Sequence, residues 1–229
     1  MDVILDVDPG VDDALAILLA LASPELTVLG LTVVNGNVQV ETGTENALRI
    51  LAFAGREDIP VFRGADQPIA RESVYALEVH GSSGLGEADL DAATQVSREN
   101  AVGYIVETLG KNPGEVCLLA VGPLTNLALA EQQSPGILSR AKGIIAMGGA
   151  VDEPGNVSPT AEFNFYADPD AASVVIQSNS NLLIVPLDVT HQIGIEAEEI
   201  DRIGLSGTKQ ARFFEQATRS VVDHGRAIG

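Results

Sequence analysis

The chain has 229 residues, 45% of them hydrophobic and 20% charged, which is typical of a folded α/β domain rather than of a disordered chain. Its net charge of -19 argues against nucleic acid and anionic membranes as partners, because their phosphates would be repelled. The single cysteine allows no internal disulfide, and the sequence contains neither a signal-peptide pattern nor an apolar run that could span a bilayer, so we expect a cytoplasmic protein with no membrane partner.

Apolar runs and amphipathic stretches alternate through the first sixty residues. We expect strands and helices to follow one another as strand Val3–Val7, helix Asp13–Leu21, strand Val28–Val34, helix Glu41–Ala54 and strand Pro60–Phe62. The strands are rich in Val, Ile and Leu, as strands buried on both faces usually are. This β-α-β-α-β order predicts a parallel sheet with right-handed crossovers.

The rest of the chain continues this alternation around two irregular segments. Residues 64–98 are predicted to form a long functional loop with a short helix, and residues 150–167 a second irregular segment. The other expected elements are helix Asn100–Leu109, strand Val116–Val121, a helix from Gly122 to about Gln133, strand Gly143–Met147, helix Asp168–Ser178, strand Leu182–Leu187 and two final helices. No repeat or linker is visible, so residues 1–229 are predicted to form a single α/β domain, with a mostly parallel, Rossmann-like open sheet flanked by helices.

Ligands of such sheets bind outside the carboxyl ends of the strands, which makes the residues just after each strand candidates for a site. These residues are Asp8, Asn35 to Asn37, Gly122, Gly148 and Asp188. His191, also close behind a predicted strand, is interpreted as a structural histidine, and Cys117 as a buried thiol.

The segment Asp6-Val7-Asp8-Pro9-Gly10-Val11-Asp12-Asp13 holds four carboxylates within eight residues. Asp6 and Asp8 share one face of the first strand, and the other two aspartates open the next helix. Anions this close repel one another unless a cation or hydrogen-bond donors compensate, and Ca²⁺ and Mg²⁺ prefer such oxygen ligands. Complementation of the helix dipole would explain the last two carboxylates but not the first two, so we favour a divalent metal site.

A second polar cluster, residues 155–164, combines the amides of Asn156 and Asn164 with the carboxylate of Glu162. Such groups can bind several sugar hydroxyls at once, because each hydroxyl both donates and accepts a hydrogen bond. Ordinary turn chemistry of Asn and Ser is the alternative. His80, next to glycines in the long loop, is interpreted either as a flexible active-site residue or as a surface histidine.

Together these motifs resemble the nucleoside hydrolases of the inosine–uridine-preferring type. The resemblance follows the family's order over essentially the whole chain, and its N-terminal motif is highly specific. The residues that carry it are Asp6-Val7-Asp8-Pro9-Gly10-Val11-Asp12-Asp13-Ala14, Asn37, His80-Gly81, Val121-Gly122-Pro123-Leu124-Thr125-Asn126, Met147-Gly148-Gly149, Ala161-Glu162-Phe163-Asn164 and Asp188-Val189-Thr190-His191.

The resemblance implies the nucleoside hydrolase fold and a tightly held Ca²⁺. Asp8 and Asp13 are expected to bind this ion through their carboxylates, and Val121 through its backbone carbonyl. Asp8 is also expected to act as general base toward a Ca²⁺-bound water, with Asn37 orienting both. The catalytic residues would then be Asp8, Asn37 and His80.

The implied reaction is attack of water on C1′ of a ribonucleoside through an oxocarbenium-like transition state, which releases ribose and a free base. The resemblance also implies a homodimer or homotetramer. The expected contacts to the substrate are Asp12 and Asn164 at the 2′- and 3′-hydroxyls, Asn156 and Glu162 at the 5′-hydroxyl, and His80 and Phe163 near the sugar–base region; Asn37 is also expected to bind the substrate.

The chain departs from the family pattern at its C-terminal end. The family carries a His-Asp-Pro motif whose Asp binds Ca²⁺ and whose His is placed to protonate the leaving base, and this motif is not found here. Asp223-His224 has the reversed order within a helical run and is not expected to replace it. Family members are also longer, so we expect the C-terminal part of the domain to be missing and the added segment to restore activity. The alternative is a genuine short form that has lost a ligand, in which metal affinity and turnover should both be lower.

Two other functions fit parts of the sequence. In a haloacid-dehalogenase-like phosphatase, Asp6 and Asp8 would be the nucleophile and acid beside Mg²⁺. Gly10 stands where that family has a hydroxyl residue or Val, and no lysine lies in a strand-end motif. The second alternative is a nucleoside- or ribose-binding protein that has lost catalysis.

Overall fold

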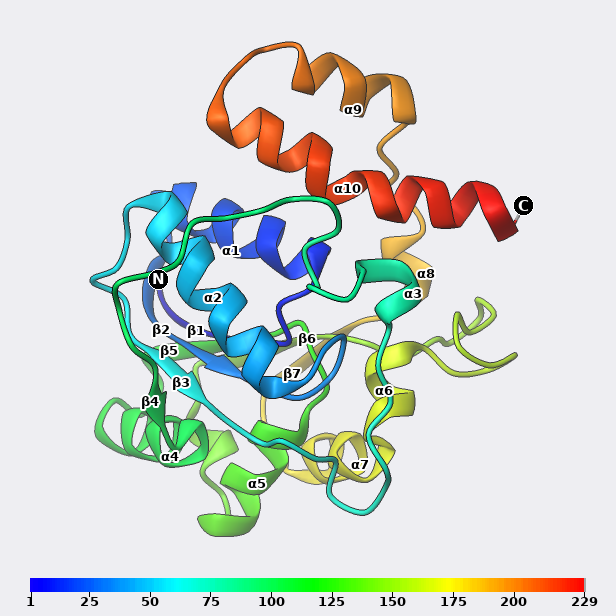
Figure 1. Ribbon diagram of the computed structural model, residues 1–229. Helices are drawn as coiled ribbons and strands as arrows, with labels where there is room; N and C mark the ends of the chain where they lie inside the picture. The colour runs from blue at the N-terminus through cyan, green and yellow to red at the C-terminus, as the bar shows by residue number, and fades with distance from the viewer. Residues whose placement is uncertain (229) are drawn as a thin grey trace.

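The computed structural model describes the backbone of residues 1–228 and their side chains except those of residues 223, 224 and 226–228. The side chains of Asp223-His224 therefore lie outside the described residues. Within the described part, seven parallel strands form one sheet in the order β4-β3-β2-β1-β5-β6-β7 (Figure 1). The strands are β1 (Asp2–Val7), β2 (Thr27–Val33), β3 (Val61–Arg63), β4 (Arg98–Glu99), β5 (Val116–Ala120), β6 (Gly143–Met147) and β7 (Leu182–Val185).

Helices cover both faces of this sheet, with α1 and α2 on one face and α4, α5 and α7 on the other (Figure 1). No helix within residues 1–228 is both long and apolar enough to cross a membrane. The helices are α1 (Val11–Ala22), α2 (Val40–Ala54), α3 (Leu77–His80), α4 (Ala101–Lys111), α5 (Thr125–Gln133), η1 (Leu138–Arg140, a 3₁₀ helix), α6 (Phe163–Ala167), α7 (Pro169–Gln177), α8 (Leu187–Thr190), α9 (Ala197–Gly204) and α10 (Lys209–Ile228).

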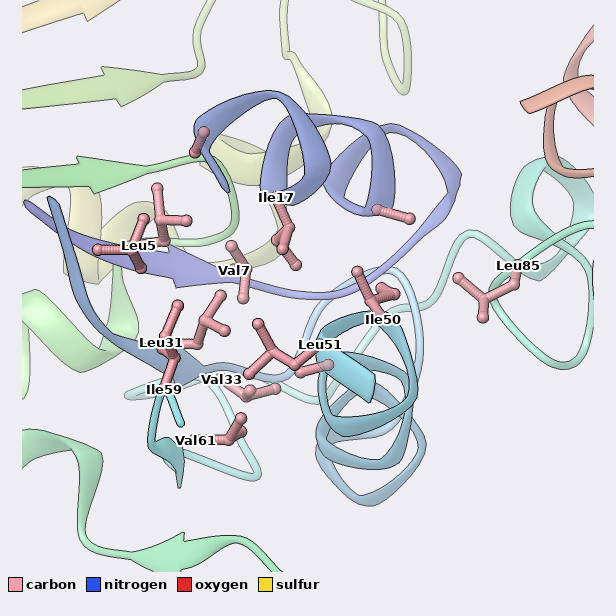
Figure 2. Close-up of a cluster of buried hydrophobic side chains, with 14 of the residues drawn as sticks. Leu5, Val7, Ile17, Leu31, Val33, Ile50, Leu51, Ile59, Val61 and Leu85 are labelled. Carbon is pink, nitrogen blue, oxygen red and sulfur yellow. The ribbon is translucent and has the colours of Figure 1, made fainter. Parts of the chain in front are cut away.

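Strand β1 contributes to two hydrophobic cores because its side chains alternate between the faces of the sheet. Val3, Leu5 and Val7 point into the core beneath α1 and α2, whose centre is shown in Figure 2. Ile4 points into the opposite core, beneath α4, α5 and α7. Asp6 shares the face of Ile4, so a fully buried carboxylate lies at the end of the second core.

The order of the strands places the topological switch point between β1 and β5. From β1 the chain builds outward to β4 on one side, and β5 to β7 then extend the sheet on the other side. Loops that leave β1 and β5 therefore diverge to opposite faces and open a crevice at their carboxyl ends, where ligands of such sheets bind. This geometry puts the segment after β1 beside the segment after β5.

The predicted parallel α/β sheet is confirmed, and the differences concern short elements. Residues 98 and 99 pair with β3 and extend the sheet, although they were predicted to end a loop. The predicted irregular segment 150–167 ends in helix α6, because the Glu162 side chain accepts hydrogen bonds from the first-turn N–H groups of Asn164 and Phe165. The predicted last strand stops at Val185, because Pro186 follows and α8 begins at Leu187.

Leu118 tests the packing of the second core, because it lies on the central strand β5 and is fully buried. Leu118→Ala should lower the free energy of unfolding by about 2–5 kcal/mol, the usual cost of such a truncation in a core that cannot collapse. Urea unfolding measures the change. Leu19→Ala is the control, because Leu19 is 70% exposed; an equal loss in both variants would contradict the assigned core.

Candidate functional site

A cavity of about 410 Å³ opens at the carboxyl ends of the central strands. Its wall comes from segments far apart in the sequence, including the ends of β5 and β6, helix α3 and one residue of α10 (Figure 1). Eight of the ten predicted site residues line it, namely Asp12, Asn37, His80, Val121, Asn156, Glu162, Phe163 and Asn164.

The other two predicted residues, Asp8 and Asp13, are buried beneath this cavity and are held by Asn37. The backbone N–H of Asn37 donates to Asp8 Oδ2 at 2.8 Å. The Asn37 amide donates to Asp13 Oδ2 at 3.1 Å and to the Asp8 carbonyl at 3.3 Å. The loop after β2 therefore joins the two carboxylates that sequence analysis assigned to one ion.

The two carboxylates differ in how many donors they receive. Asp13 accepts the backbone N–H groups of Asp8 and Gly10, at 3.2 and 3.1 Å, in addition to the Asn37 amide. Asp8 Oδ1, in contrast, is buried and has no hydrogen-bond partner among the described residues. A buried carboxylate oxygen without a donor is costly, so this atom requires a ligand from outside the protein or a proton.

The raised pKa values of Asp8 and Asp13 also indicate that this pair requires a cation or a proton. Burial, and then repulsion by Asp13, raises the pKa of Asp8 well above its ordinary value. Burial, and then repulsion by Asp12, raises the pKa of Asp13 to about 7. No arginine or lysine lines the cavity among the described residues, so the chain supplies no cation of its own there. Hard oxygen donors with uncompensated charge fit a divalent cation such as Ca²⁺.

Only two carboxylates meet at this point, and no group of three or more His, Cys, Asp or Glu side chains is arranged to hold a metal among the described residues. The predicted third ligand, the carbonyl oxygen of Val121, lies on the cavity wall and accepts the Asn164 amide at 2.8 Å. A carbonyl oxygen has two lone pairs, so one remains for a ligand.

Two glycines allow the backbone to approach Asp8 closely. A Cβ at Gly36 would lie 2.1 Å from Asp8 Oδ2, and a Cβ at Gly122 would lie 2.5 Å from Asp8 Oδ1. Neither distance leaves room for a side chain. The loops after β2 and β5 can therefore enclose the Asp8 carboxylate only because they carry glycine at these positions.

Asp6, which the sequence analysis counted toward the metal site, is compensated by hydrogen-bond donors instead. Its Oδ1 accepts the Thr32 hydroxyl at 2.5 Å and the Asn126 amide at 2.8 Å. Asn126 also donates to the carbonyl of Val33 and accepts the N–H of Ala65, so this network joins β1, β2, α5 and the long loop. Burial raises the pKa of Asp6 to about 7.

His80 lies on the cavity wall as a buried residue, which excludes the interpretation as a surface histidine. The backbone N–H of Val11 donates to its Nδ1 at 3.1 Å. Because Nδ1 accepts this bond, the neutral ring carries its proton on Nε2. Burial lowers the pKa of His80, and although Asp12 Oδ1 lies 3.8 Å from Nδ1 and opposes this shift, the net direction is toward the neutral ring.

Glu162 is buried at the start of α6, where its carboxylate both binds backbone N–H groups and keeps one acceptor site free. Its carboxylate accepts three backbone N–H groups, those of Gly149 and Asn164 at 2.9 Å and that of Phe165 at 3.2 Å. A carboxylate has about four acceptor sites, so one remains free to accept a hydroxyl from the cavity. Burial raises the pKa of Glu162, while the three N–H groups oppose that shift.

The two asparagines of the second cluster present complementary groups to the cavity. The Asn164 amide donates to the carbonyls of Val121 and Met147, which leaves its Oδ1 as an acceptor. Asn156 Oδ1 accepts the backbone N–H of Phe163 at 2.9 Å, which leaves its NH₂ group as a donor. The wall thus carries acceptors and donors side by side, as recognition of several hydroxyls requires.

Sequence reasoning missed the apolar part of the wall. The position of Met147 at the end of β6 follows the carboxyl-end rule and could have been predicted. The others come from the long loop, from residues 150–161 and from α10, whose paths no local pattern indicates. The missed residues are Ala76, Glu78, Val79, Met147, Val157 and Val221. His191, interpreted as a structural histidine, does not line the cavity; its side chain is 51% exposed and lies 3.6 Å from Glu153.

Gly36 tests the close packing around Asp8. Gly36→Ala should lower the free energy of unfolding by about 1–3 kcal/mol, because the new methyl group displaces the Asp8 carboxylate. Gly110→Ala in α4 is the control, since its methyl group meets nothing within 4 Å. Chemical denaturation of both variants measures the difference, and wild-type stability of Gly36→Ala would show that the loop does not enclose Asp8 as described.

Comparison with known proteins identifies the family of the chain. The family described as inosine-uridine preferring nucleoside hydrolase matches residues 3–228. A protein of Schizosaccharomyces pombe described as uncharacterised is 47% identical over 205 residues, which are 89% of this chain and 66% of that protein. Uridine nucleosidase 1 of Arabidopsis thaliana is 41% identical, over 96% of this chain and 66% of its own length. The chain thus spans about two thirds of the length of these curated relatives.

Solved structures of nucleoside hydrolases have the same fold as this chain. A plant nucleoside hydrolase superposes with a TM-score of 0.93 at 39% identity, over 99% of this chain and 72% of that one. A purine-preferring ribonucleoside hydrolase from Gardnerella vaginalis superposes with a TM-score of 0.95 at 31% identity, over 100% of this chain and 74% of that one. Because the family model matches residues 3–228 and the fold is shared with solved nucleoside hydrolases, this chain belongs to the inosine-uridine preferring nucleoside hydrolase family.

Proposed function

We propose that this protein hydrolyses the N-glycosidic bond of ribonucleosides to ribose and a free base. The observation that carries the proposal is the cavity itself, in which a buried, unpartnered Asp8 oxygen lies beneath a wall of hydroxyl-binding groups. Its volume of about 410 Å³ is within the usual range for small-molecule sites. The names of relatives support the same activity, because they include uridine nucleosidases and pyrimidine-specific ribonucleoside hydrolases.

The ribose is proposed to bind at the polar end of the cavity. Asn164 Oδ1 and the exposed Asp12 carboxylate would accept the 2′- and 3′-hydroxyls, and Asn156 and Glu162 would hold the 5′-hydroxyl. Binding energy from these hydroxyls can orient and distort the sugar at the reacting carbon. The base would lie toward the apolar wall, near Phe163 and His80.

Asp8 is the proposed general base. Its Oδ1 has no hydrogen-bond partner within the described residues and is therefore free to accept a proton. Its pKa is raised toward neutral pH, where a general base is most effective. Asn37 keeps the carboxylate in place through its backbone N–H. The neutral His80 ring would present its Nε2–H toward the substrate, and the surrounding carboxylates favour the positive charge that develops on the ribose.

Ca²⁺ is the proposed cofactor, held by the Asp8 and Asp13 carboxylates and the Val121 carbonyl oxygen. The support is the donor set, which consists of hard oxygens with one unpartnered atom and no cation from the protein. When bound, the ion supplies the Lewis acidity that lowers the pKa of a water molecule.

A phosphatase of the haloacid-dehalogenase type is not favoured. Such an enzyme would need Asp6 and Asp8 to face the substrate together, but Asp6 is fully buried and bonded to Thr32 and Asn126. No cationic side chain lines the cavity among the described residues to bind a phosphate.

A homodimer or homotetramer and a cytoplasmic location stay predictions.

Asp8→Asn tests the base directly. The substitution keeps the shape of the side chain but removes its ability to accept a proton, so release of base from inosine or uridine should fall by about 10²-fold or more. Asp170→Asn is the control, because Asp170 is exposed on α7 and pairs only with Arg71. Both variants are made in a chain that carries the family's C-terminal His-Asp-Pro segment, and near-normal turnover in a folded Asp8→Asn variant would remove Asp8 from the proposed role.

Removal of divalent ions tests the cofactor. Without a cation, the folded state keeps protons on Asp6 and Asp13 up to about pH 7, whereas the unfolded chain releases them near 3.8. The folded state then binds more protons, so the stability of chelated protein should fall as pH rises from about 4 to 7. Added Ca²⁺ competes with protons, so it should stabilise the protein more at about pH 8 than at about pH 5.

Thermal unfolding with and without Ca²⁺ measures both effects, and hydrolysis should stop on chelation. Asp13→Asn is the control and should lose the Ca²⁺-dependent shift. An identical unfolding temperature with chelator and with Ca²⁺ at every pH would refute the proposed ion.

A further inference from the structure

The Asp188 carboxylate takes part in a group of hydrogen bonds that has no role in the proposed reaction. It lies just after β7, in the short helix α8, and its carboxylate accepts the backbone N–H groups of three successive residues. Oδ2 accepts from Val151 at 2.9 Å, and Oδ1 accepts from Asp152 at 2.7 Å and from Glu153 at 3.2 Å. Successive N–H groups that converge on one anion form a backbone nest, and here the anion is the protein's own side chain.

The loop that Asp188 holds has little other support. Residues 150–161 contain no helix or strand, and residues 151–154 are exposed. Apart from the bonds to Asp188, the backbone–backbone hydrogen bonds of residues 150–161 join loop residues to one another in the described part of the chain, as in the bonds from Gly155 to Pro159 and from Val157 to Ala161. The ordering of this segment therefore depends on its anchors at the two ends.

A short series of bonds connects the Asp188 end to the cavity. The N–H of Leu187, next to Asp188, donates to the carbonyl of Gly149 at 2.9 Å. The N–H of Gly149 in turn donates to Glu162 Oε2 at 2.9 Å. The loop between these anchors carries Asn156, which lines the cavity beside Glu162. Asp188 itself does not line the cavity, so any effect on the ligand must pass through the loop.

We infer that Asp188 is a positioning residue that fixes loop 150–161 so that Asn156 and Glu162 meet the 5′ end of the substrate's ribose. This inference rests on the proposed function. The bonds are charge-assisted, since the N–H groups of Val151 and Asp152 lower the pKa of Asp188 and keep the carboxylate ionised at neutral pH. The chain has a net charge of -19, so an acidic side chain on its surface needs no special explanation. The Asp188 carboxylate differs because it accepts three backbone hydrogen bonds.

The test compares Asp188→Asn with the control Asp152→Asn. The asparagine at 188 would turn an NH₂ group toward an N–H donor and break the nest, whereas the Asp152 side chain has no hydrogen bond among the described residues. Each substitution removes one negative charge, and the two residues are neighbours because the Asp152 N–H donates to Asp188. The first measurement is hydrogen–deuterium exchange of peptides covering residues 148–162, and the second is steady-state hydrolysis of a ribonucleoside and of its 5′-deoxy analogue.

In Asp188→Asn we expect faster exchange at residues 151–153 and a KM for the ribonucleoside raised roughly tenfold with kcat nearly unchanged, because the lost contact holds the sugar in the ground state and the transition state alike. The 5′-deoxy analogue should show no such rise, because it lacks the hydroxyl that the loop holds. Asp152→Asn should behave as the wild type in every measurement.

Unchanged exchange, an unchanged KM, or an equal rise in KM for both substrates would overturn the inference. A loss confined to kcat would also overturn it. Failure of the proposed function would look different, because then no variant, including the wild type, releases base from any nucleoside. In that case the exchange experiment alone decides whether Asp188 holds the loop.

Discussion

The structure depends on two carboxylates that are buried side by side where β1 ends. Asp8 and Asp13 are nearly inaccessible to solvent, and burial together with repulsion by a neighbouring aspartate, Asp13 for Asp8 and Asp12 for Asp13, raises the pKa of both. Asp13 is partly compensated by three N–H donors, but one oxygen of Asp8 is left without a partner. Such a pair is stable only with a proton or a cation between the carboxylates, and a cation also creates the reactive centre that a hydrolase needs.

The fold creates this crowding and also limits it. The switch point between β1 and β5 brings the loops after β1, β2 and β5 together, and Gly36 and Gly122 let two of them close around Asp8. The neighbouring network of Asp6, Thr32 and Asn126 fixes the strand ends from below. Apart from Asp12, the groups proposed to bind the ribose hydroxyls come from the other half of the sheet, on a segment anchored by Glu162 and, as we infer, by Asp188.

Much of this could be predicted from the sequence, because the information is local. The alternation of apolar strands and amphipathic helices indicated the parallel sheet. The four carboxylates of residues 6–13 indicated a metal site, and the family resemblance implied that Asp8 and Asp13 are its ligands. What could not be predicted depends on contacts between distant segments. The role of Asp6 requires Asn126, 120 residues away, and the burial of His80 requires Val11. The two-residue strand β4 has too few residues to show a period, and its pairing with β3 decides its structure.

The central claim is that Asp8 and Asp13 share a divalent cation. The most direct measurement is a crystal structure of the Ca²⁺-loaded protein with anomalous diffraction data. The account predicts an anomalous peak within about 2.3–2.6 Å of Asp8, Asp13 and the Val121 carbonyl oxygen. An ordered water or empty density at that point, in crystals grown with saturating Ca²⁺, would contradict it.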